Sequence, residues 1–254
     1  MDTAASRDGT RIAYERDGSG PPVILIDAAG HFRANSSLGD LAELLAVHFT
    51  VYRYDRRGRG DSTDNPPYTP AREVEDVAAL IVEAGEPVSL YGYSSGALVA
   101  LHAAAAGLDI RRLALLEPPI DPAENSPVQR AFTTRLRELS GEDAVTFFLT
   151  EIGVPTDVLA GMRGSPHWAA MVSVAHTLTY DSLLAEATDA GLLARVTTPT
   201  LVLDSSGSDD DLTGMAATAA RSLPNGVHRS LPGEWHGVPA GTLAPVVADF
   251  LRRG

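Results

Sequence analysis

Five short apolar segments, separated by segments with helical periodicity, constrain the fold more than any other feature of this sequence. They lie at residues 22–26, 49–54, 87–91, 112–116 and 200–204. Each is rich in Val, Leu, Ile or Tyr and bounded by Gly, Pro or Asp, which is typical of strands buried on both faces. The helical patterns cover about 38–47, 71–85, 95–106, 211–222 and 241–252. This alternation predicts an α/β fold, with helices on both faces of a mostly parallel sheet.

Two segments depart from the alternation. Residues 10–18 alternate apolar and polar side chains and end in a turn, which predicts an antiparallel strand at the start. Residues 120–195 show helical spacing without a strand pattern, so we expect a helical lid over the C-terminal edge of the sheet, where open α/β sheets bind ligands. Its apolar side chains are candidates either for lining a substrate pocket or for packing against the core: Trp168, Met171, Phe147 and Phe148.

Composition excludes several classes of protein. The chain has 254 residues, which one α/β domain can accommodate, and no cysteine, which excludes disulfides and a cysteine nucleophile. Its net charge of −13, without a basic stripe, argues against nucleic acid as a partner. Without a signal-peptide core or a run of about 18 apolar residues, we expect a cytoplasmic protein that needs no membrane. Neither a metal nor a cofactor is expected, because no metal-ligand spacing occurs. The sequence leaves open whether the protein forms a homo-oligomer.

Ser94 lies where a predicted strand passes into an alanine-rich predicted helix, within Gly92-Tyr93-Ser94-Ser95-Gly96. A G-x-S-x-G pattern between strand and helix predicts a nucleophilic serine raised on a sharp turn. The glycines allow that turn and let the helix approach closely. The amide of Ser95 opens the helix, where free N–H groups favour developing negative charge.

Together with two further motifs, this turn resembles the α/β-hydrolase fold superfamily over nearly the full length of the chain. "YDRRGRGDS" at 54–62 is similar to the family's D-x-R-G-x-G-x-S loop. His236, in "LPGEWHGVPAG", falls where the family's histidine follows the last strand, and the chain order of serine and histidine is also the family's. The resemblance implies an eight-stranded sheet, with Ser94 as nucleophile and His236 as the base that accepts its proton.

The acid that orients His236 is left open by the resemblance. In the family it most often follows strand seven, where direct counting puts Ser208, and Asp209 and Asp210 come next. Capping of the following helix is the alternative role for these aspartates. Glu117, directly after strand six in "LALLEPPI", is similar to the acid of some family members, certain dehalogenases among them. Asp209 and Glu117 stand as equal candidates, ahead of Asp210.

The oxyanion hole implied by the resemblance consists of the amides of Ala29 and Ser95. Where the family has His-Gly after strand three, this chain has Asp-Ala, in "ILIDAAGHF". An ionised Asp27 facing the substrate would oppose a negatively charged intermediate, whereas pointing away, or pairing with Arg57 or His31, would make it harmless, as is more common for such a residue. Asp27 is therefore a candidate substrate-binding residue that could alter the chemistry.

Three functions follow from these features. We expect a serine hydrolase that cleaves an ester, lactone or thioester of a small, largely apolar molecule. The alternative is a cofactor-free lyase, isomerase or biosynthetic cyclase, which the altered stretch at Asp27 favours, since fold does not fix the reaction. A ligand-binding protein with a vestigial site is disfavoured by the intact Ser94 and His236.

Overall fold

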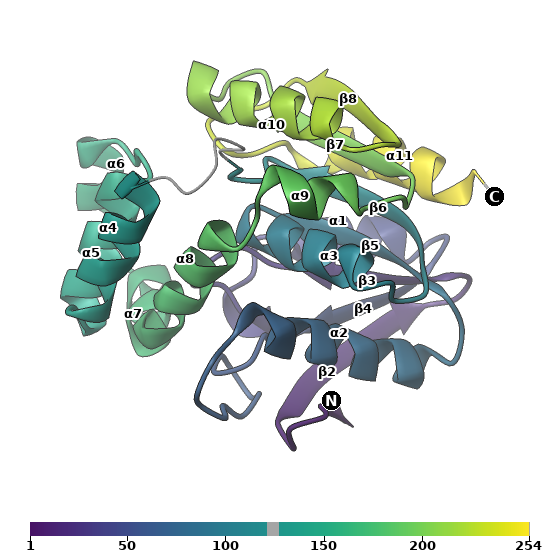
Figure 1. Ribbon diagram of the computed structural model, residues 1–254, viewed down its shortest axis with the longest axis horizontal. Coiled ribbons are helices and arrows are strands. Elements are labelled where there is room, and N and C mark those ends of the chain that lie inside the picture. The colour runs from purple at the N-terminus through teal and green to yellow at the C-terminus, as the bar shows by residue number, and fades with distance from the viewer. Residues whose placement is uncertain (121–126, 254) are drawn as a thin grey trace.

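The computed structural model of the protein describes residues 1–120 and 127–253. Within these ranges eight strands form one sheet, in the order β1-β2-β4-β3-β5-β6-β7-β8 (Figure 1). The strands are β1 (Asp2–Ala5), β2 (Arg11–Gly18), β3 (Pro22–Ile26), β4 (Thr50–Tyr54), β5 (Val88–Tyr93), β6 (Ile110–Leu116), β7 (Thr200–Ser205) and β8 (Gly226–Leu231). β2 pairs antiparallel with β1 and β4, and all other pairs are parallel. The predicted α/β fold with a mostly parallel, eight-stranded sheet is confirmed.

Helices cover both faces of the sheet. α1 (Gly39–Leu45) and α11 (Ala240–Arg252) pack on one face, and α2 (Pro70–Ala84), α3 (Ser95–Ala105) and α10 (Asp210–Ser222) pack on the other. In β3, Val23 and Leu25 join the first layer, whereas Ile24 and Ile26 join the second. Every residue of β3 is therefore buried, which explains its uninterrupted apolar run.

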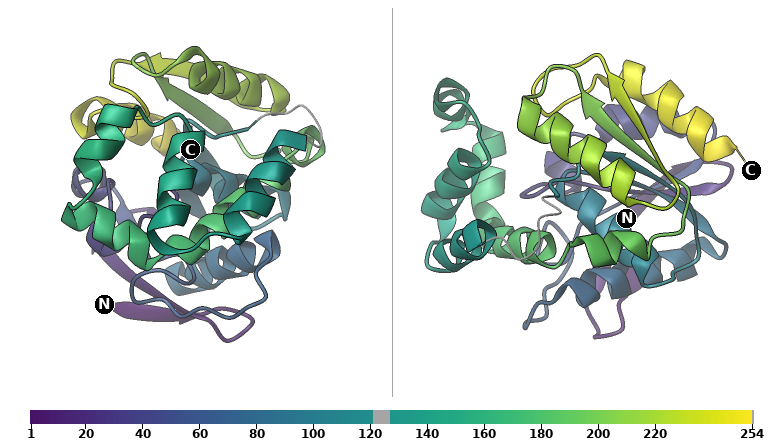
Figure 2. Two further views of the ribbon diagram at one scale, coloured as in Figure 1. Left: turned by 90° about the vertical axis from the view of Figure 1, so that its left-hand side faces the viewer. Right: turned by 45° about the horizontal axis from the view of Figure 1, so that its top comes forward.

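The described part of the chain between β6 and β7 is mostly helical and contains no strand. Its helices are α4 (Pro127–Arg137), α5 (Gly141–Glu151), α6 (Thr156–Met162), α7 (Pro166–Ser173), the 3₁₀ turn Ala175–Thr177, α8 (Leu178–Glu186) and α9 (Ala190–Ala194). We call residues 127–194 the helical insertion. α4 to α7 form a lobe beside the sheet, with an apolar core of their own, and α8 lies between this lobe and the sheet (Figures 1 and 2). The predicted lid at 120–195 also includes residues 121–126, which lie outside the described residues.

The topology creates a crevice next to β3. β3 lies between β4 on one side and β5 on the other. The chain leaves β3 toward β4, so the loops after β3 and β5 diverge at this point. In open α/β sheets, ligands bind at such a switch point, at the carboxyl ends of the strands. Ser94 and Ala29 follow these two strands.

Two strands escape the sequence patterns, β1 and the largely exposed β8. β1 has four residues, three of them exposed, so it carries almost no apolar signal and is held by pairing with β2. No helix within the described ranges is long and apolar enough to cross a bilayer.

Candidate active site

Ser94 forms a strained turn between β5 and α3, with φ 53° and ψ −121°. For a residue other than glycine, such a backbone costs on the order of 1–3 kcal/mol. The neighbouring glycines allow the turn because a Cβ on Gly92 would lie 2.5 Å from the Cα of Ala97. A Cβ on Gly96 would lie 2.2 Å from the carbonyl oxygen of Ile26. The two glycines thus let α3 begin directly against the end of β3.

Glu117 and His236 meet across the edge of the sheet. The Nδ1 of His236, in the loop between β8 and α11, lies 2.5 Å from Oε2 of Glu117, which directly follows β6 and is fully buried. The Oε1 of Glu117 accepts hydrogen bonds from the hydroxyl of Ser208 (2.6 Å) and the amide of Ser205 (2.8 Å). A carboxylate held in this way fixes the imidazole with a proton on Nδ1, and this leaves Nε2 to accept a proton.

Opposing effects set the pKa of Glu117. Burial alone would raise the pKa, but hydrogen bonds from His236, Ser208 and the Ser205 amide outweigh burial and hold the pKa below its usual value. The carboxylate is therefore ionised at neutral pH. The hydroxyl of Ser208 also accepts a hydrogen bond from the amide of His236 (2.9 Å), so it connects the acid to the histidine loop.

Ser94, Glu117 and His236 share an unusual backbone conformation. Within the described ranges, the non-glycine residues with positive φ are Ser94, Glu117 and His236, at 53°, 45° and 53°. They come from three separate loops, and strain of this kind clusters at functional sites. This coincidence marks one site independently of the side-chain contacts.

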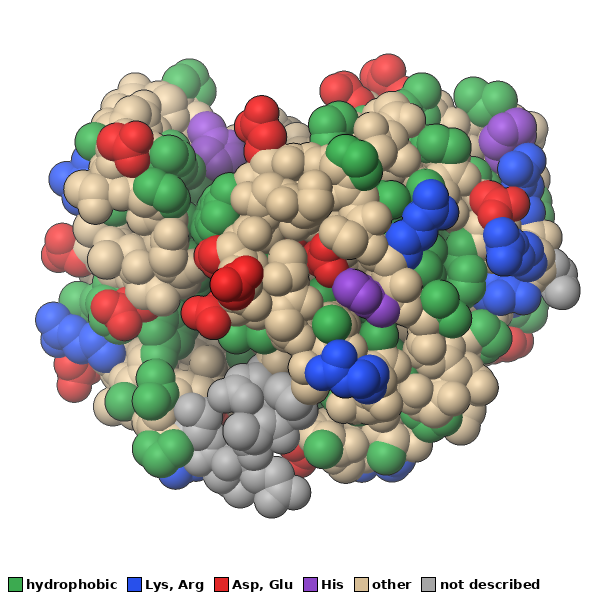
Figure 3. All heavy atoms as spheres, turned by 90° about the horizontal axis from the view of Figure 1, so that it is seen from above, with side chains coloured by type: hydrophobic (Ala, Val, Ile, Leu, Met, Phe, Trp, Pro, Cys, Tyr) green, Lys and Arg blue, Asp and Glu red, His purple; other side chains and the backbone are tan. Residues whose placement is uncertain are grey.

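Ser94 and His236 line one cavity of about 950 Å³ between the sheet edge and the helical insertion. Seen from above, the surface is indented between these two parts (Figure 3). Apolar residues from both parts line the cavity: Phe132, Phe147, Met171 and Trp235. Polar lining is contributed by His31, His167 and Gln129. Within the described ranges no cluster of three His, Asp or Glu residues could hold a metal ion.

Ala29 and Ser95 line this cavity beside Ser94, and neither backbone amide has an acceptor in the described chain. The amide of Ser94 itself donates to the carbonyl of Leu116 (2.9 Å) and is unavailable. Ser95 is the first residue of α3, where free N–H groups and the helix dipole favour negative charge. The arrangement can therefore stabilise an oxyanion next to the serine.

Asp27 is not among the residues that line the cavity, so the structure shows the harmless arrangement and does not support its candidate role in substrate binding. Its Oδ1 accepts from the amide of Ala28 (2.8 Å), and its Oδ2 accepts from the hydroxyl of Ser36 (2.5 Å). Neither Arg57 nor His31 bonds to it in the described structure. The carboxylate fixes its own loop, because these two short hydrogen bonds satisfy it there.

Of the two places expected for Trp168, the structure shows packing in the core and does not support its candidate role in substrate binding. It packs in the core of the helical insertion, 5% exposed, with the guanidinium of Arg163 5.6 Å from the centre of its ring. The cavity is lined instead by Trp235, whose ring centre lies 5.4 Å from that of His236. Its position directly before the predicted base is the signal that could have identified it.

The aspartates after β7 do not contact His236 in the described structure. Asp209 caps α10, accepting from the amide of Leu212 at 2.9 Å, and accepts weakly from Nε1 of Trp235 at 3.3 Å. Asp210 is the exposed first residue of that helix. Of the carboxylates considered from the sequence, the structure brings Glu117 to the histidine.

Comparisons with known proteins agree with this fold. A family model described as "Alpha/beta hydrolase family" matches residues 17–249. The crystal structure of an alpha/beta hydrolase from Sphaerobacter thermophilus DSM 20745 is 43% identical, with a TM-score of 0.85 over 98% of this chain and 99% of that one. An enol-lactonase from Burkholderia xenovorans LB400 shares the fold at 23% identity, with a TM-score of 0.78 over 98% and 99%.

A curated relative matches over a shorter stretch. The N-formylmaleamate deformylase of Pseudomonas putida is 34% identical over 136 residues. The match spans 52% of this chain and 48% of the deformylase, so about half the length of each protein.

Proposed function

The chain belongs to the alpha/beta hydrolase family, and from this premise we propose that it is a serine hydrolase that cleaves an ester, lactone or thioester of a small, largely apolar molecule. The observation that carries the proposal is the 2.5 Å contact between His236 and Glu117, beside the cavity that Ser94 also lines. A nucleophile, a base and an acid that orients the base are the three parts that acyl transfer requires.

In this mechanism, the Oγ of Ser94 attacks the carbonyl carbon of the substrate while Nε2 of His236 takes the hydroxyl proton. The ionised Glu117 stabilises the imidazolium that forms. The amides of Ala29 and Ser95 donate to the oxyanion of the tetrahedral intermediate. His236 then gives its proton to the leaving group, and a water molecule attacks the acyl-enzyme by the same steps in reverse.

The cavity supports a small substrate with apolar parts. Its volume of about 950 Å³ lies at the upper end of the range for small-molecule pockets, roughly 300–1,000 Å³. Phe132, Phe147 and Met171 contribute apolar surface from the helical insertion. We therefore take the chain as one domain in which the insertion acts as a lid that shapes specificity.

The contacts of Asp27 bear on the non-hydrolytic alternative. That alternative rested on a carboxylate close to the developing oxyanion. Because Asp27 bonds to Ser36 and to the amide of Ala28, its charge is directed into its own loop. This placement supports hydrolysis over a lyase or isomerase reaction.

Labelling with a fluorophosphonate probe tests the proposal directly. We expect one adduct per chain, mapped to Ser94 by mass spectrometry, and none in Ser94→Ala. A panel of p-nitrophenyl esters, lactones and thioesters then ranks substrates. The panel includes N-formylmaleamate because a relative of this chain is an N-formylmaleamate deformylase. A wild-type protein that is neither labelled nor active on any of these substrates would refute the proposal that it is a serine hydrolase.

A further inference from the structure

Three arginines in the loop after β4 are buried and ion-paired. Arg56, Arg57 and Arg59 are each 1% exposed. Burying a guanidinium is costly unless carboxylates and carbonyls satisfy it, so the partners of each arginine indicate what it holds in place. None of the three contributes its side chain to the catalytic steps above.

Arg56 and Arg59 share one carboxylate from the helical insertion, that of Asp181 on α8. Nη1 of Arg56 lies 2.7 Å from Oδ1, and Nη2 of Arg59 lies 2.7 Å from Oδ2. Burial alone would raise the pKa of Asp181, but the two guanidinium groups outweigh burial and hold the pKa below its usual value. Asp181 is therefore an ionised counter-ion that connects the insertion to the loop after β4.

The same two guanidinium groups also bond to the segments that carry the oxyanion amides, the Ala28–Ala29 peptide and Ser95. Nη1 of Arg59 donates to the carbonyl of Ala28 at 2.8 Å. That carbonyl belongs to the same planar peptide unit as the amide of Ala29, and in a trans peptide the two groups point in opposite directions. Fixing the carbonyl therefore fixes the direction of the Ala29 N–H. Nη1 of Arg56 donates to the hydroxyl of Ser95 at 3.0 Å.

We propose that Arg59, Arg56 and Asp181 form a positioning network that aims both oxyanion amides, with Arg59 as its principal positioning residue. The helical insertion thereby completes the oxyanion hole through Asp181, in addition to covering the cavity. This inference rests on the proposed function, since the oxyanion arises from attack by Ser94.

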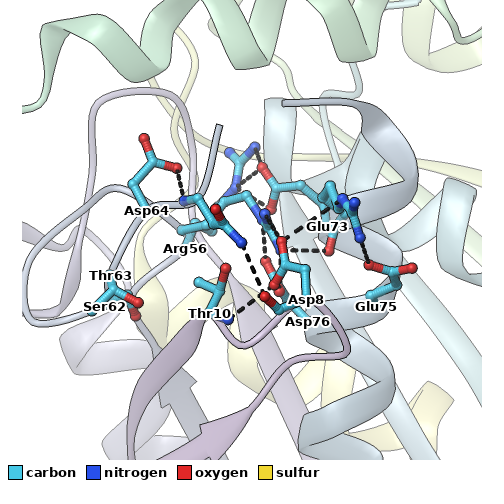
Figure 4. Close-up of polar contacts among 12 residues, drawn as sticks. Asp8, Thr10, Arg56, Ser62, Thr63, Asp64, Glu73, Glu75 and Asp76 are labelled. Atoms are coloured by element: carbon cyan, nitrogen blue, oxygen red, sulfur yellow. Dashed lines mark hydrogen bonds and ion pairs between the residues drawn. The ribbon is translucent and has the colours of Figure 1, made fainter. Parts of the chain in front are cut away.

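Arg57 provides a matched control within the same loop. It is as buried as Arg59 and as firmly paired, with Asp76 at 2.7 and 2.8 Å and Asp8 at 2.9 Å. These partners lie on α2 and in the turn between β1 and β2, where the carboxylates of Asp8, Asp76 and Glu73 point toward one cluster (Figure 4). Arg57 therefore shares the energetic environment of Arg59 but bonds to neither oxyanion segment.

The test compares Arg59→Lys with Arg57→Lys. Lysine keeps the charge, but its single nitrogen cannot occupy both positions that the two guanidinium nitrogens hold against the carboxylate and the carbonyl. We expect both variants to lose stability, and Arg59→Lys alone to lose about 10- to 100-fold in kcat, with KM within about twofold. Its affinity for a boronic acid that forms a tetrahedral adduct on Ser94 should fall by a similar factor. Unchanged kcat in Arg59→Lys, or equal losses in both variants, would overturn the network.

A second measurement does not depend on turnover. In ¹⁵N-labelled protein, the Ala29 amide resonance should shift in Arg59→Lys and in Asp181→Asn, and remain in place in Arg57→Lys. An unchanged resonance in both network variants would overturn the inference even if the enzyme is a hydrolase. A wild-type protein that is neither labelled by the fluorophosphonate nor active on the substrate panel would instead refute the proposed function, whatever the resonance shows.

Discussion

At Ser94, backbone strain and chemistry can be separated by two substitutions. Glycine tolerates φ 53° with ψ −121° far better than alanine does. We therefore expect Ser94→Gly to have a free energy of unfolding about 1 kcal/mol higher than Ser94→Ala, measured by urea titration. Both should lose roughly 10³-fold or more in kcat, because both lack the nucleophile. Equal stabilities would mean that the turn is not strained, and retained activity would leave Ser94 a positioning residue.

The acid is tested by Glu117→Gln beside Asp209→Asn. Because Glu117 bonds to His236, its amide variant should lose on the order of several hundred-fold in kcat. Asp209 caps α10, so its variant should keep its kcat within about threefold and lose roughly 1 kcal/mol of stability or less. The reverse order of kcat would identify Asp209 as the acid, and two near-wild-type variants would remove the need for one.

The choice of acid also shows where prediction from sequence ended. β6 and β7 are adjacent in the sheet, so the loops after both strands reach the histidine, and the motif alone does not distinguish them. Ser208 stands at the position expected for the acid and donates a hydrogen bond to Glu117, and this contact supports Glu117 as the proposed acid. Ser94 and His236 were identifiable because each lies in a local motif.

At the scale of elements, strands buried on both faces were predictable because each leaves an uninterrupted apolar run. All five runs appear as strands, and the end of each lies within two residues of its predicted end. What the sequence could not indicate are contacts between distant elements, such as that of Arg59 with Asp181, 122 residues apart. Nothing near Asp181 in the chain marks it as a partner of the β4 loop.

One such contact predicts how stability depends on pH. His102 of α3 bonds to Thr188, between α8 and α9, at 3.0 Å, and burial lowers its pKa to about 4. Its unfolded pKa is about 6.5, so the unfolded chain binds more protons between these values, and stability falls as pH drops through that window. We expect wild type to lose about 2 kcal/mol between pH 7.5 and 5 relative to His102→Gln, which cannot titrate.

Denaturant titrations of both proteins at several pH values measure this difference. Parallel stability curves for the two proteins would show that His102 does not titrate differently on folding. A buried neutral histidine that joins α3 to the insertion would be supported if His102→Gln loses less free energy of unfolding in acid than wild type does. This difference between the two proteins should develop only below about pH 6.5.

At the scale of the whole molecule, the net charge of −13 should influence which substrates arrive. Acidic side chains are spread over the face seen in Figure 3. Charged residues around the cavity are also mostly acidic: Glu151, Glu186, Asp189, Asp209 and Asp211, beside Arg130 and Arg135. A field of this sign attracts cations and repels anions over about one Debye length, near 10 Å at 0.1 M salt.

Salt should therefore have opposite effects on esters of opposite charge. Between about 0.02 and 0.5 M NaCl, kcat/KM for a cationic choline-type ester should fall several-fold, and kcat/KM for an isosteric anionic ester should rise. The neutral isostere is the control, because it separates screening from any general effect of salt on the fold. Since steering changes encounter and not the chemical step, kcat should stay constant in all three series. If all three esters respond alike, the acidic surface has no part in substrate selection and serves solubility alone.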